Sequence, residues 1–164
     1  MPVNKEYAVL ENPTEGISVS TNMEDYPSGL VISVDKPYRW TSTDVVRKTK
    51  FRLQRFFGLK NIKVGHAGTL DPLATGVLLI CVGKATKVAE QLQAQPKEYI
   101  ADVRFGSTTP SFDLEKEIDE EFPYEHISAE TIENILPEFV GKLEQIPPIF
   151  SAKLINGNRA YELA

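Results

Sequence analysis

Several residue types on which common protein classes depend are scarce in this chain of 164 residues. Its single cysteine, Cys81, cannot form a disulfide within the chain and indicates a reducing compartment. The two histidines, His66 and His126, stand far apart in the sequence, so the spacing of a zinc site is absent. We therefore expect no metal centre and no disulfide-stabilised fold.

Long apolar segments are also missing. The longest apolar run, residues 76–83, suits a buried strand and is too short to cross a membrane. No basic stretch followed by an apolar one opens the chain, which argues against a secretory signal. The glycine pattern of dinucleotide-binding loops is absent, and Ala85 replaces the hydroxyl residue that a phosphate-binding loop requires after Lys84. We expect a soluble, cytoplasmic protein without membrane contact.

The charge of the chain is unevenly distributed. The net charge is −5, yet residues 35–104 carry +7 while residues 105–145 carry −9. Local charge matters more than net charge for the capture of a polyanion. A basic region on an acidic protein is compatible with RNA binding, although it does not establish it.

Hydrophobic periodicity predicts strands and helices without a regular alternation, which favours an α+β fold. Residues 1–26 are polar and aperiodic and are interpreted as an N-terminal extension, and residues 27–164 as one domain. The predicted strands cover 30–35, 62–64, 77–82, 97–105, 142–146 and 149–155. The predicted helices cover 42–57, 85–92, 128–140 and 159–164.

The first predicted helix carries most of the positive charge. Thr41 and Asp44 have the spacing of a capping box, and Gly58 suits the helix end. An apolar face is expected from Val45, Val46, Thr49, Leu53, Phe56 and Phe57. Cations occupy much of the remaining surface, namely Arg47, Lys48, Lys50, Arg52 and Arg55. They form either a solvated helix face or a surface that contacts RNA phosphates.

The loop over residues 65–76 is the best candidate for a catalytic site. Three glycines allow unusual backbone conformations there, and Pro72 restricts the chain just after Asp71. The buried strand that follows provides a rigid base for a precisely placed carboxylate. Asp71 is therefore a candidate nucleophile or base, while the alternative is that its side chain only satisfies the amides of a turn.

This loop resembles the signature of the TruB-type tRNA pseudouridine synthases. The similar residues are 65–78, which read Gly-His-Ala-Gly-Thr-Leu-Asp-Pro-Leu-Ala-Thr-Gly-Val-Leu. The resemblance as a whole extends over roughly residues 29–164. Further matching segments are Asp35–Pro37, Gly83–Lys87, Lys97–Tyr99, Gln145–Pro148, Phe150–Lys153 and Tyr161–Glu162.

The resemblance implies a mixed, mostly antiparallel sheet flanked by helices, and isomerisation of uridine 55 in the TΨC loop of tRNA. Asp71 would attack C1′ or C6, and no cofactor or metal would be needed. Tyr99 would stack on the target base or help to remove its C5 proton, unless it is an aromatic of a buried strand face. His66 would fill the gap left by the flipped base. Lys36 would support the pocket or contact RNA, unless it is only a turn residue.

The resemblance further implies that Gly68 and Thr69 line the substrate site. The charge of the helix, rather than the resemblance, makes Arg47, Lys48, Arg52 and Arg55 the expected contacts to the RNA backbone. Pro110 stands about where many relatives carry an aspartate. The family's later Lys-Gly-Thr-Tyr-Ile-Arg-like strand, whose Arg would pair with the catalytic carboxylate, is not found before Ala164, and neither is its C-terminal RNA-binding domain.

Three hypotheses follow. The first is a partial catalytic domain of a tRNA pseudouridine synthase, inactive by itself, whose full-length form is a monomer. The second is a non-catalytic RNA-binding fragment of such an enzyme. The third is a small-molecule hydrolase that uses Asp71.

Overall fold

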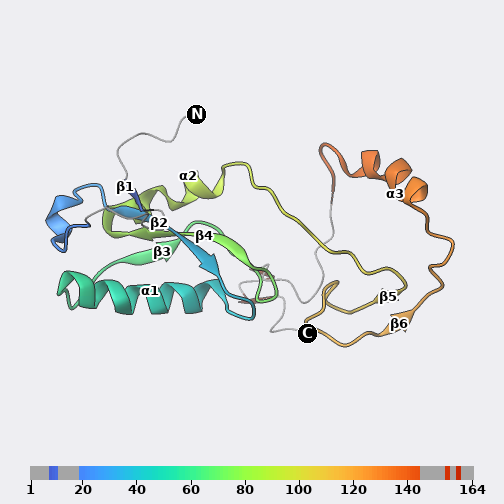
Figure 1. Ribbon diagram of the computed structural model, residues 1–164, viewed down its shortest axis with the longest axis horizontal. Coiled ribbons are helices and arrows are strands. Elements are labelled where there is room, and N and C mark those ends of the chain that lie inside the picture. The colour runs from blue at the N-terminus through green and yellow to red at the C-terminus, as the bar shows by residue number, and fades with distance from the viewer. Residues whose placement is uncertain (1–7, 11–18, 145–153, 156–157, 160–164) are drawn as a thin grey trace. The chain divides into compact units, whose positions relative to one another are not determined.

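The computed structural model describes residues 8–10, 19–144, 154–155 and 158–159 (Figure 1). The chain divides into two compact units, Met1–Glu98 and Tyr99–Ala164. The candidate catalytic loop and the basic helix both belong to the first unit. Helices and largely antiparallel strands are mixed in both units, so the α+β prediction is confirmed.

A four-stranded sheet with the order β1-β2-β4-β3 forms the centre of the first unit. β2 (Leu30–Lys36) and β4 (Gly76–Val82) pair antiparallel over seven residues, from Leu30 opposite Val82 to Lys36 opposite Gly76. β3 (Val64–His66) pairs antiparallel with the other edge of β4, and β1 (Ala8–Leu10) pairs parallel with β2. The apolar strand β4 therefore has a neighbouring strand on each edge.

Side chains of β4 alternate between two cores because successive residues of a strand point to opposite faces. Leu78, Ile80 and Val82 pack with Val45 and Phe57 of the helix α1 (Ser42–Phe57). The opposite face is covered by the 3₁₀-helix η2 (Gly83–Val88) and the helix α2 (Ala89–Gln93), on the side of the sheet away from α1 (Figure 1). Its core contains Val31, Ala67, Cys81 and Ala85.

Helix α1 follows its sequence signals closely. Thr41 and Asp44 form the predicted capping box, and Gly58 ends the helix with a φ of 65°, a left-handed conformation that glycine adopts without strain. The prediction that Phe56 belongs to the apolar face packed in the core is wrong. Its side chain is 43% exposed and packs edge-on against Phe57. The cations of the helix all lie on its exposed side.

Some secondary structure differs from prediction. The segment predicted as extension contains β1 and the 3₁₀-helix η1 (Met23–Asp25), whose Met23 packs on the main core. The helix predicted over 85–92 is split into η2 and α2. The strand predicted over 97–105 is not formed. Tyr99 and Ile100, whose side chains would point to opposite faces of such a strand, are both exposed. A strand needs a partner for its backbone, and no described strand pairs with this segment.

The second unit consists of short elements. β5 (Ser107–Thr108) pairs antiparallel with β6 (Glu120–Glu121), and β7 (Leu154–Ile155) pairs with β8 (Asn158–Arg159). Ser128 caps α3 (Ala129–Ile135) as predicted, and the 3₁₀-helix η3 (Leu136–Phe139) begins where Pro137 excludes an α-helix. The strand predicted over 142–146 is not formed at residues 142–144, and its remainder lies outside the described residues. Most of the strand predicted over 149–155 and of the helix predicted over 159–164 also lies outside them, although Arg159 belongs to β8.

Candidate active site

The loop between β3 and β4 is shaped by two glycines. Gly68 has a φ of 114° and Gly76 a φ of 115°, conformations that other residues rarely adopt. No atom lies within 4 Å of a Cβ built at either position, so the need for glycine comes from the backbone angle rather than from space. The amide of Ala74 donates to the carbonyl of Asp71 at 3.1 Å and closes a turn around Pro72. Asp71 stands exposed on this turn.

The residue before Asp71 is held by a serine from the helix. Ser42, the first residue of α1, is buried, and its Oγ donates to the carbonyl of Leu70 at 3.1 Å. The same Oγ accepts a hydrogen bond from the amide of Leu70 at 3.0 Å. One hydroxyl therefore satisfies both backbone groups of Leu70. In the sequence, Ser42 only stands between Thr41 and Asp44 of the capping box, and no local pattern predicts its contact with Leu70.

The residue after Asp71 is held by the segment that follows β2. The carbonyl of Pro72 accepts from the amide of Arg39 at 2.8 Å and from Nζ of Lys36 at 3.3 Å. Together with Ser42, these contacts fix the backbone on both sides of Asp71. The carboxylate is thus exposed on a loop whose path is tightly constrained, which is the arrangement that a nucleophile or base requires.

Lys36 is the largest fully buried side chain among the described residues. Its ammonium has three N–H groups, and three carbonyl oxygens accept from it: Pro37 at 3.2 Å, Trp40 at 2.6 Å and Pro72 at 3.3 Å. Burial lowers the pKa of Lys36 from its usual 10.5, and the nearby carboxylate of Asp71 acts in the opposite direction. The fold therefore brings a cation from β2 close to Asp71, although no cation is near it in sequence.

His66 ends β3 at the start of the loop and is half-buried. Its Nδ1 lies 2.5 Å from the carbonyl oxygen of Gly68, so this nitrogen carries the proton in that contact. In the neutral ring Nε2 is then left as an acceptor. Among the other predicted site residues, Gly68 is partly covered, Thr69 is exposed, and Tyr99 is 67% exposed as the first residue of the second unit. The roles of these residues stay predictions.

The basic side of α1 carries the predicted RNA-backbone residues. All four residues are exposed, namely Arg47, Lys48, Arg52 and Arg55. Exposure is required both for a solvated helix face and for a surface that contacts RNA phosphates. Arg47 lies 3.6 Å from Asp44. Hydrogen bonds from Thr41 are the main cause of the lowered pKa of Asp44, and the charge of Arg47 contributes less.

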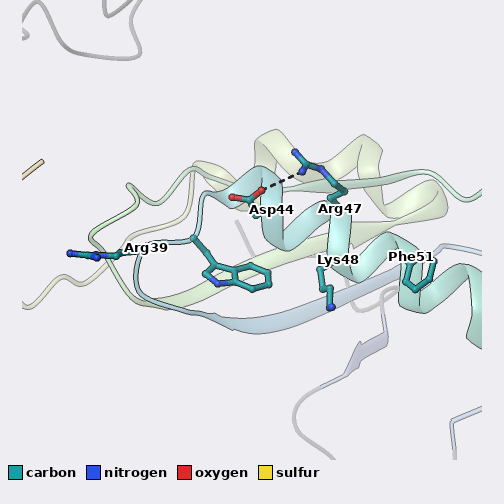
Figure 2. Close-up of a pocket in the computed structure, with 6 residues that line it drawn as sticks. Arg39, Asp44, Arg47, Lys48 and Phe51 are labelled. Atoms are coloured by element: carbon teal, nitrogen blue, oxygen red, sulfur yellow. Dashed lines mark ion pairs between the residues drawn. The ribbon is translucent and has the colours of Figure 1, made fainter.

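The first half of α1 also borders a pocket that the sequence did not reveal. Its walls are formed by Arg39, Trp40, Asp44, Arg47, Lys48 and Phe51. Figure 2 shows Lys48 and Phe51 along the helix, Asp44 joined to Arg47, and Arg39 on the preceding turn with its side chain directed away from the helix. The available signal was Trp40, the one tryptophan of the chain, placed directly before the helix cap.

The described part of the chain contains no metal-binding cluster and no membrane-spanning helix. There, no three His, Cys, Asp or Glu side chains are grouped so that they could hold a metal ion. Within the same residues, every helix is too short or too polar to cross a membrane.

The chain is similar to proteins of one known family. The model of the TruB family pseudouridylate synthase (N terminal domain) matches residues 54–164. A protein of Phocaeicola vulgatus named tRNA pseudouridine synthase B is 57% identical over 140 residues, which cover 85% of this chain and 60% of that protein. Proteins of the same name from Parabacteroides distasonis and Flavobacterium johnsoniae are 56% and 52% identical, over 60% and 62% of their lengths. The chain spans about 60% of the length of these relatives.

Proposed function

Since the chain belongs to the TruB family of pseudouridylate synthases, we propose that it supplies the catalytic aspartate of an enzyme that converts uridine to pseudouridine in tRNA. The proposed target is uridine 55 of the TΨC loop, and the proposed nucleophile is Asp71. One observation carries this proposal: the backbone is fixed at both Leu70 and Pro72, so the residue between them, which bears the exposed carboxylate, has a fixed position in the loop.

The proposed reaction conserves all atoms of the substrate. Asp71 attacks either C1′ of the ribose or C6 of the uracil, and the bond between N1 and C1′ breaks. The uracil then rotates, and its C5 forms a bond to C1′. The bond between Asp71 and the substrate breaks, which restores the free carboxylate. The proton at C5 leaves, and N1 finishes with a proton, so neither an oxidant nor a co-substrate is consumed. Lys36 would act as a positioning residue, because its ammonium fixes the carbonyl of Pro72 and places a positive charge near Asp71.

Base flipping is part of the proposal because a uridine within a stacked loop cannot reach an aspartate on the protein surface. His66 would then occupy the space that the uracil leaves. Its ring is oriented by the Nδ1 contact with Gly68, so the imidazole would enter the stack without further ordering. Tyr99 would stack on the flipped base.

The loss of the C5 proton provides the assay. The protein, extended by any coding sequence that follows Ala164, should release tritium from tRNA labelled at C5 of uridine. Asp71→Asn should abolish this release while tRNA affinity changes only a few-fold, since phosphate contacts supply most of the binding energy. Glu90→Gln removes an exposed carboxylate on α2 and serves as the control.

The outcomes separate the hypotheses. Tritium release by Asp71→Asn within tenfold of the unmodified protein would exclude Asp71 as the nucleophile. Binding of tRNA without tritium release would favour the non-catalytic RNA-binding fragment. A transcript with cytidine in place of uridine 55 should release no tritium, and release from it would move the target to another position.

A further inference from the structure

The pocket beside α1 combines aromatic and cationic side chains. Its volume is about 520 Å³, within the range of about 300–1,000 Å³ that is usual for small-ligand pockets. Trp40 is 37% exposed and Phe51 57% exposed, so both rings are accessible to a ligand. Arg47 and Lys48 bring two positive charges to the pocket, whereas Arg39, which also borders it, is directed away from the helix, and its guanidinium carbon lies 5.5 Å from the centroid of the Tyr38 ring. Aromatic faces bordered by cations are the features with which proteins bind unpaired nucleotides.

We propose that this pocket binds an unpaired nucleotide of the substrate RNA, with its base stacked on Trp40 and its phosphate near Lys48. This nucleotide is distinct from the uridine that reacts at Asp71. The inference rests on the proposed function for the identity of the RNA, and it extends that function to a second contact.

The pocket is joined to the candidate active site by direct hydrogen bonds. The carbonyl of Trp40 accepts from Nζ of Lys36 at 2.6 Å, and the same nitrogen donates to Pro72. The amide of Arg39 also donates to Pro72, at 2.8 Å. The ammonium of Lys36 thus connects the backbone of Trp40 with the residue that follows Asp71. An RNA that places a uridine at Asp71 therefore has neighbouring nucleotides within reach of the pocket.

The backbone of Trp40 and the ring of Phe51 both have contacts within the protein before any ligand arrives. The amide of Trp40 donates to the carbonyl of Pro37 at 3.2 Å, in addition to its bond with Lys36. The guanidinium carbon of Arg55 lies 5.7 Å from the centroid of the Phe51 ring, at the distance of a cation–π contact. Prior ordering reduces the entropy that binding would otherwise cost.

The backbone before Trp40 is strained. Arg39 has a φ of 65°, a left-handed conformation that is unfavourable for a residue with a side chain. Such strain tends to occur at functional sites, where the surrounding structure enforces it. Here the bond between the Arg39 amide and Pro72 accompanies the strained conformation, and the next residue is the exposed tryptophan.

The one acidic residue of the pocket does not oppose this assignment. Asp44 accepts hydrogen bonds from the amide and the hydroxyl of Thr41, at 3.1 and 2.6 Å, and lies 3.6 Å from Arg47. Its carboxylate is therefore occupied within the protein. The positive charge that remains for a ligand is that of Lys48, and it is complementary to phosphate.

Because Trp40 is the one tryptophan of the chain, its fluorescence reports on this pocket alone. A TΨC stem-loop RNA should quench the tryptophan emission on titration, because an unpaired base stacks on the indole. A fully paired duplex with the stem sequence carries the same kind of phosphates but offers no unpaired base, and it should cause little quenching. Anisotropy of the end-labelled RNA measures binding independently in both titrations.

Variants of the pocket complete the test. Trp40→Leu should weaken stem-loop binding about tenfold, as expected for one lost base stack, while Trp40→Phe should recover most of the affinity. Phe56→Leu is the control, since Phe56 is an exposed aromatic of α1 outside the pocket. Thermal melting of each variant shows whether it is folded.

Stem-loop binding without quenching, or equal quenching by stem-loop and duplex, would overturn the pocket assignment, and so would a failure of the stem-loop to bind at all. The tritium-release assay is read separately. A protein that releases tritium but shows no quenching retains the proposed function and loses only the pocket.

Discussion

Replacing Ser42 by alanine removes one hydroxyl that bonds to both the amide and the carbonyl of Leu70. A hydrogen bond of this kind contributes about 1 kcal/mol to stability, and Leu70 is only partly buried, so water can solvate part of what is left unpaired. We therefore expect Ser42→Ala to lower the free energy of unfolding by about 2 kcal/mol. With a urea slope of about 2 kcal/mol per molar, the midpoint of unfolding should fall by about 1 M.

The effect on activity should be separable from the effect on stability. Loss of the Leu70 contacts allows the chain before Asp71 to shift, and a misplacement of about 1 Å can cost about a hundredfold in rate. The tritium-release assay should therefore show a kcat lowered by about tenfold or more with KM nearly unchanged, at temperatures where the variant is folded.

Thr43→Ala is the matched control, because Thr43 is the next residue of α1 and is exposed. It removes a hydroxyl at an almost identical helix position and should change stability by less than about 0.5 kcal/mol. Equal urea midpoints for the two variants would show that Ser42 does not hold the loop. A destabilised Ser42→Ala with unchanged kcat would show that the position of Asp71 does not depend on it.

Three further predictions concern charge and burial. Changing Lys48 and Arg52 to glutamine should reduce the slope of log affinity for tRNA against log salt by about one per lost phosphate contact, and an unchanged slope would place both cations in solvent. The lowered pKa of Asp44 means that its hydrogen bonds stabilise the fold above pH 3.8, its ordinary pKa, and that this contribution is lost as the pH falls through the lower value. Acid titration should accordingly show the stability of Asp44→Asn falling less steeply than that of the unmodified chain, and parallel curves would contradict this. Burial raises the pKa of the Cys81 thiol, so a thiol reagent should label it slowly in the folded protein and rapidly in urea, and rapid labelling without denaturant would mean that the β4 core opens readily.

Features encoded by neighbouring residues were predictable from the sequence. The capping box of Thr41 and Asp44 spans one helical turn, and the buried strand β4 is visible as an apolar run. The candidate loop around Asp71 was found from its glycines and from its resemblance to a family. In each case the signal and the structure that it encodes occupy the same short segment.

Features that depend on distant partners were missed. The bonds between Ser42 and Leu70 join residues far apart in sequence, and so does the approach of Lys36 to Pro72. The alternating pattern at Tyr99 and Ile100 predicted a strand, but alternation cannot specify the partner that a strand requires. The pocket at Trp40 depends likewise on how a turn and a helix face lie in space.

The pairing of β2 with β4 has a consequence for synthesis of the protein on the ribosome. β2 is made first, and β4, with which it pairs over seven residues, ends only at Val82. More than forty further residues must therefore be synthesised before the pairing of Leu30–Lys36 is complete. During that interval its apolar side chains and unpaired backbone are open to chaperones and to other chains. The ammonium of Lys36 can contact Pro72 only after the 36 residues that separate them in sequence have been made. The nascent chain therefore forms this part of its candidate active site only after the loop that carries Asp71 has been made.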